Sequence, residues 1–228
     1  GAVSLTIDTN SLVVSVVLVG RGSQTLIQET LQSVLDQQTD FAFEVLFSSR
    51  MLNLDNPWLH ELCSTDDRLR VIDQTDKSDP TGKQELAAFV RESRGRYISL
   101  LNCGDRWTNP RRLRTLVEFM EELPHCGICF NRVLCDRVDG RSPSVSLPET
   151  DRAGSTFDDL LQQQFIPPSA AILRRSTVDP LPAWFDGLPA HEWPLYLYAS
   201  VEGTIGYCNQ TMTVCQLDAT NPGRSGDP

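Results

Sequence analysis

The 228-residue sequence has no run of about 18 apolar residues, the length that a helix needs to cross a bilayer. Its first residues also lack the basic segment followed by an apolar segment that is typical of a secretory signal. We therefore expect no transmembrane segment and a protein that works in the cytoplasm.

Positive charge is also scarce, because 20 Lys and Arg stand against 30 Asp and Glu, for a formal net charge of -10. The field of such a chain repels the phosphates of nucleic acids and of anionic lipids. We therefore expect no nucleic-acid partner, although a local basic pocket is compatible with this balance.

The seven cysteines are odd in number and lie mostly in apolar segments, which favours reduced thiols over a disulfide framework. Cys126 and Cys129 have the Cys-x-x-Cys spacing of a zinc site, but a second matched pair is missing. We interpret both as small buried hydrophobic side chains. A protein that binds metal through thiols is the weaker alternative.

Apolar segments alternate with helical patterns along the chain, which indicates a doubly wound α/β sheet. Residues 12–19 form a β-branched run typical of a strand buried on both faces, and Ser23 can cap the helix that follows. The longest loop is expected at residues 136–155. Strands are predicted at residues 12–19, 43–47, 69–72, 96–101, 127–134, 170–173, 204–207 and 213–217, and helices at residues 23–35, 58–63, 84–94, 109–122 and 193–202.

Ligands of open α/β sheets bind beyond the carboxyl ends of the strands, which here nominates residues 20–23, 48–55 and 102–107. In the third stretch a buried strand ends in a turn of small residues that carries Asp105. We expect Asp105 to be exposed at the sheet edge, where it could hold a cation or a ribose hydroxyl. Its alternative role is to cap a turn or a helix.

Residues 95–107, with the sequence GRYISLLNCGDRW, resemble the stretch GxYIxxLDxDDxW of the family 2 glycosyltransferases. The resemblance covers most of the chain. It includes ETLQSVLDQ at residues 29–37, FEVL at 43–46, FIPPS at 165–169, HEWPL at 191–195 and GTIGY at 203–207.

This resemblance implies a single GT-A domain over residues 1–228, with a Rossmann-like, mixed and mostly parallel sheet and helices on both faces. Residues 12–135 would bind a nucleotide diphosphate sugar and residues 156–219 an acceptor, while residues 220–228 would form a tail. The implied reaction is an inverting transfer of the sugar to a hydroxyl of a glycan or another acceptor.

The resemblance also implies roles for individual residues. Glu192 occupies the position of the family's catalytic Asp and would deprotonate the acceptor hydroxyl; alternatively, it is an ordinary acid at a helix start. The other implied roles are donor binding by Gly20, Ser48, Asn102 and Asp105, acceptor-side contacts by His191 and Trp193, and metal binding by Asp105 and Asp218.

Several acids of the family's donor motifs are missing. Where the family has Asp-x-Asp, this chain has Asn102, Cys103 and Gly104. Because Mg²⁺ and Mn²⁺ prefer hard oxygen ligands, we expect a weak cation site. The same losses fit a second hypothesis, a catalytically inactive relative that keeps the fold as a binding or assembly module.

Two further groups have alternative interpretations. Arg111, Arg112 and Arg114 could attract a diphosphate, but on a helix they favour a solvated face. Trp184 and Phe185 are expected in the core, although aromatic rings on the acceptor side could stack on a sugar.

Overall fold

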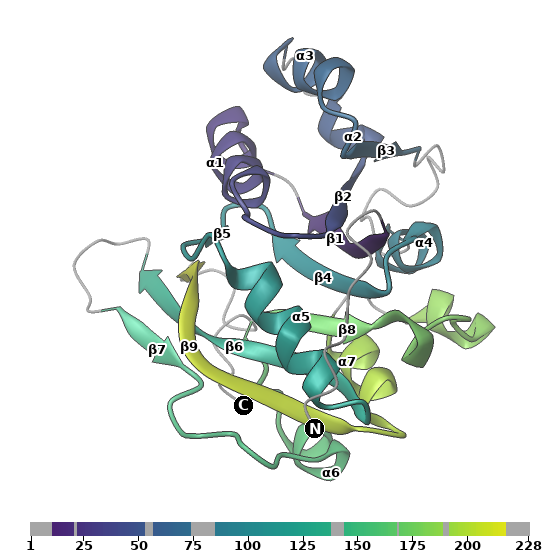
Figure 1. The fold of residues 1–228 in the computed structure, drawn as a ribbon, viewed down its shortest axis with the longest axis vertical. Coiled ribbons are helices and arrows are strands. Elements are labelled where there is room, and N and C mark those ends of the chain that lie inside the picture. The colour runs from purple at the N-terminus through teal and green to yellow at the C-terminus, as the bar shows by residue number, and fades with distance from the viewer. Residues whose placement is uncertain are drawn as a thin grey trace.

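The computed structural model describes residues 11–20, 22–52, 57–73, 85–137, 144–167, 169–188 and 192–217. The described strands form one mixed sheet of nine, with helices on both faces (Figure 1). The strands are β1 Leu12–Val19, β2 Ala42–Ser48, β3 Leu69–Ile72, β4 Tyr97–Asn102, β5 Arg106–Trp107, β6 Cys126–Arg137, β7 Val145–Leu147, β8 Ala171–Arg174 and β9 Thr204–Leu217. The α-helices are α1 Gln24–Leu35, α2 Ser49–Leu52, α3 Pro57–Thr65, α4 Glu85–Glu92, α5 Arg112–Glu122, α6 Phe157–Gln162 and α7 Glu192–Ser200, and two short 3-10 helices span Arg175–Thr177 and Ala183–Gly187.

The strand order is β3-β2-β1-β4-β8-β6-β9-β5, with β7 paired to β6. The first four strands are parallel, β8 is antiparallel to both β4 and β6, and β6 and β9 are parallel. The expected mixed, mostly parallel architecture is therefore confirmed. None of the helices in the described ranges is long and apolar enough to cross a membrane.

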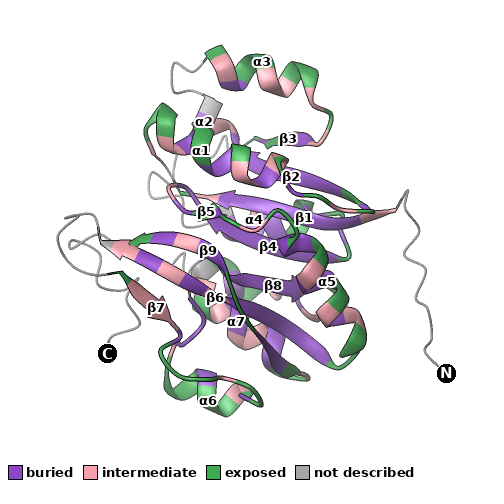
Figure 2. Cartoon of the chain, turned by 60° about the vertical axis from the view of Figure 1, so that its left-hand side comes forward, coloured by how far each residue is buried: buried purple, intermediate pink, exposed green. Residues whose placement is uncertain are grey.

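The helices bury one apolar core on each face of the sheet. Residues of α1, α3 and α5 pack in one core, and residues of α4, α6 and α7 pack in the other. The central strands are buried along almost their whole length, as Figure 2 shows for β1 and β4. This two-sided burial explains why residues 12–19 read as a continuous apolar run.

Most of the predicted elements are present, with ends shifted by a few residues. The Oγ of Ser23 accepts a hydrogen bond from the backbone N–H of Leu26 and so caps α1, as predicted. Two predictions about strands are wrong. Residues 204–207 and 213–217 belong to one strand, β9, because it pairs with β6 along its length and bulges absorb the residues between them. Within the expected loop at 136–155, β7 pairs with residues 133–135 of β6.

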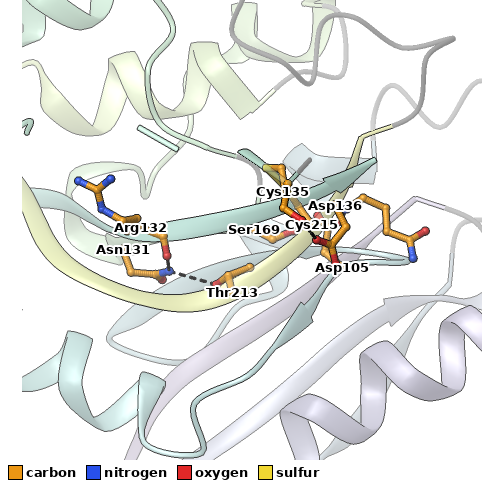
Figure 3. Close-up of a disulfide and its surroundings, with 10 residues drawn as sticks. Asp105, Asn131, Arg132, Cys135, Asp136, Ser169, Thr213 and Cys215 are labelled. Atoms are coloured by element: carbon orange, nitrogen blue, oxygen red, sulfur yellow. Dashed lines mark hydrogen bonds between the residues drawn. A yellow bond between two sulfur atoms is a disulfide. The ribbon is translucent and has the colours of Figure 1, made fainter. Parts of the chain in front are cut away.

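The prediction of reduced thiols is wrong for Cys135 and Cys215, which form a disulfide (Figure 3). They are register partners on β6 and β9, with Cα atoms 4.6 Å apart although 80 residues separate them in the sequence. The spacing of the cysteines along the sequence could not reveal that Cys135 and Cys215 lie side by side. Cys126 and Cys129 are free and buried, as expected for small core side chains.

Trp184 and Phe185 differ in burial, so the prediction that both lie in the core is wrong for Trp184. Phe185 is buried, whereas Trp184 is 57% exposed and packs edge-on against Tyr198. The short 3-10 helix that contains them turns consecutive side chains in different directions, so a single apolar pair does not bury both.

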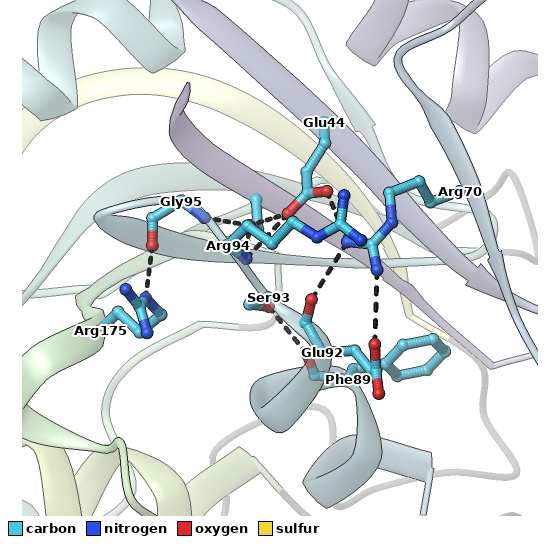
Figure 4. A network of polar contacts seen from close by, with 9 residues as sticks. Glu44, Arg70, Phe89, Glu92, Ser93, Arg94, Gly95 and Arg175 are labelled. Carbon is cyan, nitrogen blue, oxygen red and sulfur yellow. Dashed lines mark hydrogen bonds and ion pairs between the residues drawn. The ribbon is translucent and has the colours of Figure 1, made fainter. Parts of the chain in front are cut away.

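A polar network fixes the start of β4 against its neighbours (Figure 4). The buried carboxylate of Glu44 accepts hydrogen bonds from the hydroxyl of Ser15 at 2.6 Å and from the backbone N–H of Arg94 at 2.9 Å. It also pairs with Arg70 at 2.7 Å. The N–H of Gly95 donates to Ser15, and its carbonyl accepts from Arg175. The network thus orders the entry into β4, the strand that leads to the predicted ligand site.

We expect Gly95→Ala to lower the free energy of unfolding by about 3 kcal/mol, the upper end for overpacking. A Cβ at Gly95 would lie 2.5 Å from the backbone N of Ser15 and 2.6 Å from the carbonyl carbon of Val14, and backbone atoms cannot move aside cheaply. Gly154→Ala is the matched control, because Gly154 has φ +78° but open space around it. Its expected cost is about 1–2 kcal/mol. Equal costs in denaturant titrations would contradict the close contact at Gly95.

Candidate functional site

The carboxyl ends of β2, β1 and β4 lie side by side, since these three strands are parallel neighbours. Gly20 follows β1 with φ +89° and is exposed, while Ser48 and Asn102 are the buried last residues of β2 and β4. Val19 is the register partner of Asn102, and the N–H of Cys103 donates to the Val19 carbonyl at 2.8 Å. Gly20, Ser48 and Asn102 therefore share one edge of the sheet, where the right-handed α/β topology puts ligands.

The turn after β4 is closed rather than open to solvent. Gly104 has φ +98°, and the N–H of Asp105 donates to the carbonyl of Asn102 at 3.0 Å. From α1, Thr30 accepts a hydrogen bond from the N–H of Gly104 and donates one to the carbonyl of Asp105. These two hydrogen bonds attach the turn to α1, the helix that follows β1.

Asp105 is fully buried, so the expectation of an exposed acid is wrong. One carboxylate oxygen accepts a hydrogen bond from the hydroxyl of Ser169 at 2.6 Å (Figure 3). The other accepts a hydrogen bond from the backbone N–H of Gln216 at 3.2 Å. The partners lie 64 and 111 residues away in the sequence. The segment before β8 and the end of β9 therefore cover an acid that local sequence places at a sheet edge.

Ser169 is the residue that connects the β4 turn to the second half of the chain. Its hydroxyl also accepts a hydrogen bond from the N–H of Asn102 at 2.8 Å. Its carbonyl accepts from the indole N–H of Trp107 at 3.2 Å and from Arg112 at 3.4 Å. Ser169 has φ +60°, a conformation that costs energy for a residue with a side chain and persists only where its surroundings impose it. Sequence reasoning assigned it no role, and the only signal was the FIPPS match.

Arg112 is fully buried, so the prediction of a solvated face is wrong for this residue, whereas Arg111 and Arg114 are exposed. Its guanidinium donates to Asn131, to Ser99 and to the carbonyl of Ala170, and it lies 4.1 Å from the centre of the Trp107 ring. Burial lowers the pKa of Arg112 to about 9, so the cation persists at pH 7. The N–H groups of the Arg112 guanidinium therefore bind neutral acceptors and connect the residues inside the site.

Glu192 and Trp193 are the first residues of α7. Glu192 is partly exposed, and the indole N–H of Trp193 donates to the carbonyl of Leu160, which ties α7 to α6. One turn further, the hydroxyl of Tyr196 is buried without a hydrogen-bond partner. Burial, and then the negative charge of Glu192, raise the pKa of Tyr196, while the charge of Arg112 acts in the opposite direction. Glu192 and Arg112 therefore both lie within electrostatic reach of Tyr196.

His191 and Asp218 lie outside the described residues. Hydrogen bonds of Ser169 connect Asp105 to Arg112, whose charge acts on the pKa of Tyr196 on the helix of Glu192. A common cleft between Asp105 and Glu192 stays a prediction.

The described residues do not form a site for Mg²⁺ or Mn²⁺. No group of three His, Cys, Asp or Glu side chains in the described ranges could hold a metal ion. Both carboxylate oxygens of Asp105 already accept hydrogen bonds, and Asn102 offers only an amide where a carboxylate would be a stronger ligand.

We expect Ser169→Ala to lower the free energy of unfolding by about 2–4 kcal/mol. The change removes one hydroxyl and leaves two buried partners, the N–H of Asn102 and the carboxylate of Asp105, each with a lost hydrogen bond. The control is Ser64→Ala, at an exposed serine whose change should stay within about 0.5 kcal/mol. A Ser169 variant as stable as this control in urea titrations would mean that the hydrogen bonds of the Ser169 hydroxyl contribute little to stability.

Two mycobacterial proteins resemble this chain over most of its length. Protein Rv1520 of Mycobacterium tuberculosis and protein Mb1547 of Mycobacterium bovis, both described as uncharacterized, are each 26% identical to it over 224 residues. The matches cover 90% of this chain and 59% of each relative, so the chain spans about three fifths of their length.

The similar structures share the fold at low sequence identity. TarS 1-349 of S. aureus has a TM-score of 0.65 and 18% identity, covering 94% of this chain and 62% of that one. The same protein in complex with UDP-GlcNAc has a TM-score of 0.63 and 18% identity, covering 90% and 59%. The mannosyltransferase PcManGT from Pyrobaculum calidifontis, in complex with GDP-Man and Mn2+, has a TM-score of 0.58 and 14% identity, covering 90% and 56%.

The model of the glycosyl transferase family 2 matches residues 15–181, well over half of the chain. This match begins within β1 and extends beyond β8, so it includes Gly20, Ser48, Asn102 and Ser169. The chain therefore has the GT-A fold and belongs to glycosyl transferase family 2.

Proposed function

We propose that this chain transfers a sugar from a nucleotide diphosphate sugar to a hydroxyl group of an acceptor, with inversion at the sugar carbon. The observation that carries the proposal is the shared edge of Gly20, Ser48 and Asn102 in a chain of family 2. Similar structures bind UDP, UDP-GlcNAc or GDP-Man, which supports a nucleotide-linked donor as the substrate class.

Residues 12–135 would bind the donor. Exposed backbone at Gly20 allows a ligand to approach closely, because no Cβ stands in the way. Ser48 and Asn102 add polar groups at the ends of the neighbouring strands. Asp105 would act on the donor indirectly, since its carboxylate holds the turn that presents this edge.

Residues 156–219 would bind the acceptor, with Glu192 as the general base and with His191 and Trp193 beside it. A hydroxyl is a poor nucleophile until a positioned base takes its proton. Glu192 would accept that proton as the acceptor oxygen bonds to the sugar carbon and the bond to the diphosphate breaks, which releases the nucleoside diphosphate. The position of Glu192 at the first turn of α7, with its side chain partly exposed, supports this role because an acceptor can reach the carboxylate.

A divalent cation, if bound, would offset charge on the leaving diphosphate. Asp105 and Asp218 are the candidate ligands, and we infer a weak site because the acids of the Asp-x-Asp motif are replaced by Asn102 and Gly104. No step of the proposed reaction is assigned to the cation.

The second candidate function is an inactive binding or assembly module. The observation that favours it is the engagement of both oxygens of Asp105 within the protein, next to a motif without its metal-binding acids. The two candidates differ in their response to nucleotide sugars, because only the enzyme would turn them over.

We expect calorimetric titration with UDP and GDP to show binding of one nucleotide, strengthened by less than about tenfold when Mn²⁺ is added. A site without the acids of the Asp-x-Asp motif contributes few hard ligands, so the metal should add little affinity. Release of free sugar or its transfer from the matching nucleotide sugar would support the enzyme. If neither nucleotide and neither nucleotide sugar binds, the result would favour the inactive module.

Glu192→Gln should lower turnover by about a hundredfold or more, the usual loss for a general base, while the midpoint of thermal unfolding changes little. Glu202→Gln is the matched control, since Glu202 is an exposed acid just beyond the same helix. The control should keep wild-type turnover. Full activity in Glu192→Gln would remove this residue from the mechanism.

A further inference from the structure

A cavity of about 650 Å³, the α1–β5 cavity, lies between α1 and residues 106–110. Helix α1 and strand β5 lie side by side in the fold (Figure 1). Small-molecule sites in proteins typically measure about 300–1,000 Å³, so this volume suits a ligand. Gly20, Ser48 and Asn102 do not line the cavity, and neither do Glu192 and Trp193. It is therefore distinct from both parts of the candidate site.

The first wall consists of polar side chains from α1 and the two residues after it. They form two rows, because residues four apart in a helix lie one above the other. One row is Gln28, Gln32 and Asp36, and the other is Thr25, Glu29, Ser33 and Gln37. The opposite wall includes the exposed side chains of Arg106, Thr108 and Pro110. Since this segment faces α1, the polar side chains enclose a hollow, whereas an ordinary helix surface is convex.

Hydrogen bonds hold the two walls at a fixed separation. The Oγ of Ser33 accepts a hydrogen bond from the backbone N–H of Trp107 at 3.1 Å. The side-chain amide of Gln37 donates to the carbonyl of Asn109 at 2.9 Å and accepts from the N–H of Leu113 at 3.0 Å. The α1–β5 cavity is therefore preformed and does not need a ligand to open it.

Other side chains of the lining keep hydrogen-bonding capacity for a ligand. Within the described part of the chain, the side chains of Thr25, Gln28 and Thr108 make no hydrogen bond. Gln32 donates to Asp36 at 2.8 Å, which leaves the side-chain carbonyl of Gln32 as an acceptor. Amide and hydroxyl groups that can both donate and accept therefore face the cavity.

The charges of the lining disfavour a charged ligand of either sign. The carboxylates of Glu29 and Asp36 would repel a phosphate or a carboxylate, and the guanidinium of Arg106 would repel an ammonium group. Glu29 and Arg106 lie 3.7 Å apart, and their side chains are 53% and 46% exposed, so a ligand would meet both charges. A hydroxyl accepts hydrogen bonds from a guanidinium or an amide N–H and donates to a carboxylate. The lining therefore fits a neutral ligand with many hydroxyl groups.

We propose that the α1–β5 cavity binds a neutral saccharide chain. Gln28, Gln32, Glu29 and Asp36 would bind its hydroxyl groups, and the apolar C–H face of a sugar ring would pack on Pro110. The inference rests on the proposed transferase function, which would bring a glycan to this chain as acceptor or product. The cavity would hold sugars remote from the reacting hydroxyl, because α1 and α7 pack in cores on opposite faces of the sheet.

The test is calorimetric titration of the full chain with maltohexaose, cellohexaose and N-acetylchitohexaose, compared with glucose and with anionic hexagalacturonate. At least one neutral hexasaccharide should bind about tenfold or more tightly than glucose, because a cavity of this volume holds more than one sugar ring. If none of the three binds, or if hexagalacturonate binds more tightly than all of them, the proposed site is wrong.

The double variant Gln28→Ala/Gln32→Ala should weaken binding of that hexasaccharide by about tenfold or more, since it removes two amides that would each make hydrogen bonds to the ligand. Both positions are exposed on a helix, where alanine is well tolerated. Gln162→Ala/Gln163→Ala is the matched control, at two exposed glutamines on and just after α6, and should keep wild-type affinity. Equal affinities of the two double variants would place the saccharide elsewhere and contradict the proposal.

A second measurement uses the wild-type chain and does not depend on the variants folding. Carbodiimide labels accessible carboxylates, and mass spectrometry should show that the bound hexasaccharide protects Glu29 and Asp36. Glu61, an exposed acid of α3, should be labelled equally with and without the saccharide. Unchanged labelling of Glu29 and Asp36 would overturn the site.

Titrations with UDP and GDP separate this inference from the proposed function. Nucleotide binding without protection of Glu29 and Asp36 would remove the saccharide site and leave the transferase proposal standing. Protection without nucleotide binding would have the opposite meaning. Gln28→Ala/Gln32→Ala should keep wild-type nucleotide affinity, and a loss would show that the cavity serves the donor instead of a saccharide chain.

Discussion

Four hydrogen bonds of Ser169 attach the end of β4 and the residues that follow it to the segment that leads into β8. Its hydroxyl joins the end of β4 to the carboxylate of Asp105, and its carbonyl receives Trp107 and Arg112. A left-handed serine is costly by itself, so the surrounding contacts must compensate for it. Because the same residue leads into β8, the geometry of the edge at Asn102 depends on a segment more than 60 residues further along the chain.

The architecture could be predicted from sequence because local patterns determine most of its elements. The apolar run at residues 12–19 indicates a strand covered on both faces, and Ser23 indicates where the next helix begins. The disulfide and the continuity of β9 could not be predicted, since both come from the pairing of β6 with β9. Pairing over 80 residues leaves no periodic signal in either strand.

The candidate site was predictable to the level of a sheet edge, but not to that of individual side chains. Strand order brings Gly20, Ser48 and Asn102 to one edge, as the rule for open sheets requires. The burial of Asp105 and Arg112 follows from distant partners that no local pattern encodes. Two groups that a helix or turn pattern assigns to the surface are thus part of the interior, where they organise the site instead of facing solvent.

The neighbourhood of Gln216 has a practical consequence for the handling of this protein. The backbone N–H of Gln216 donates a hydrogen bond to Asp105. Gln216 directly follows Cys215, which forms the disulfide with Cys135. Breaking that bond with a reductant would leave the strand end on which the acid relies held by its pairing with β6 alone. Samples purified with and without dithiothreitol are therefore two distinct chemical species at this position, and their ligand affinities should be compared only after free thiols have been counted.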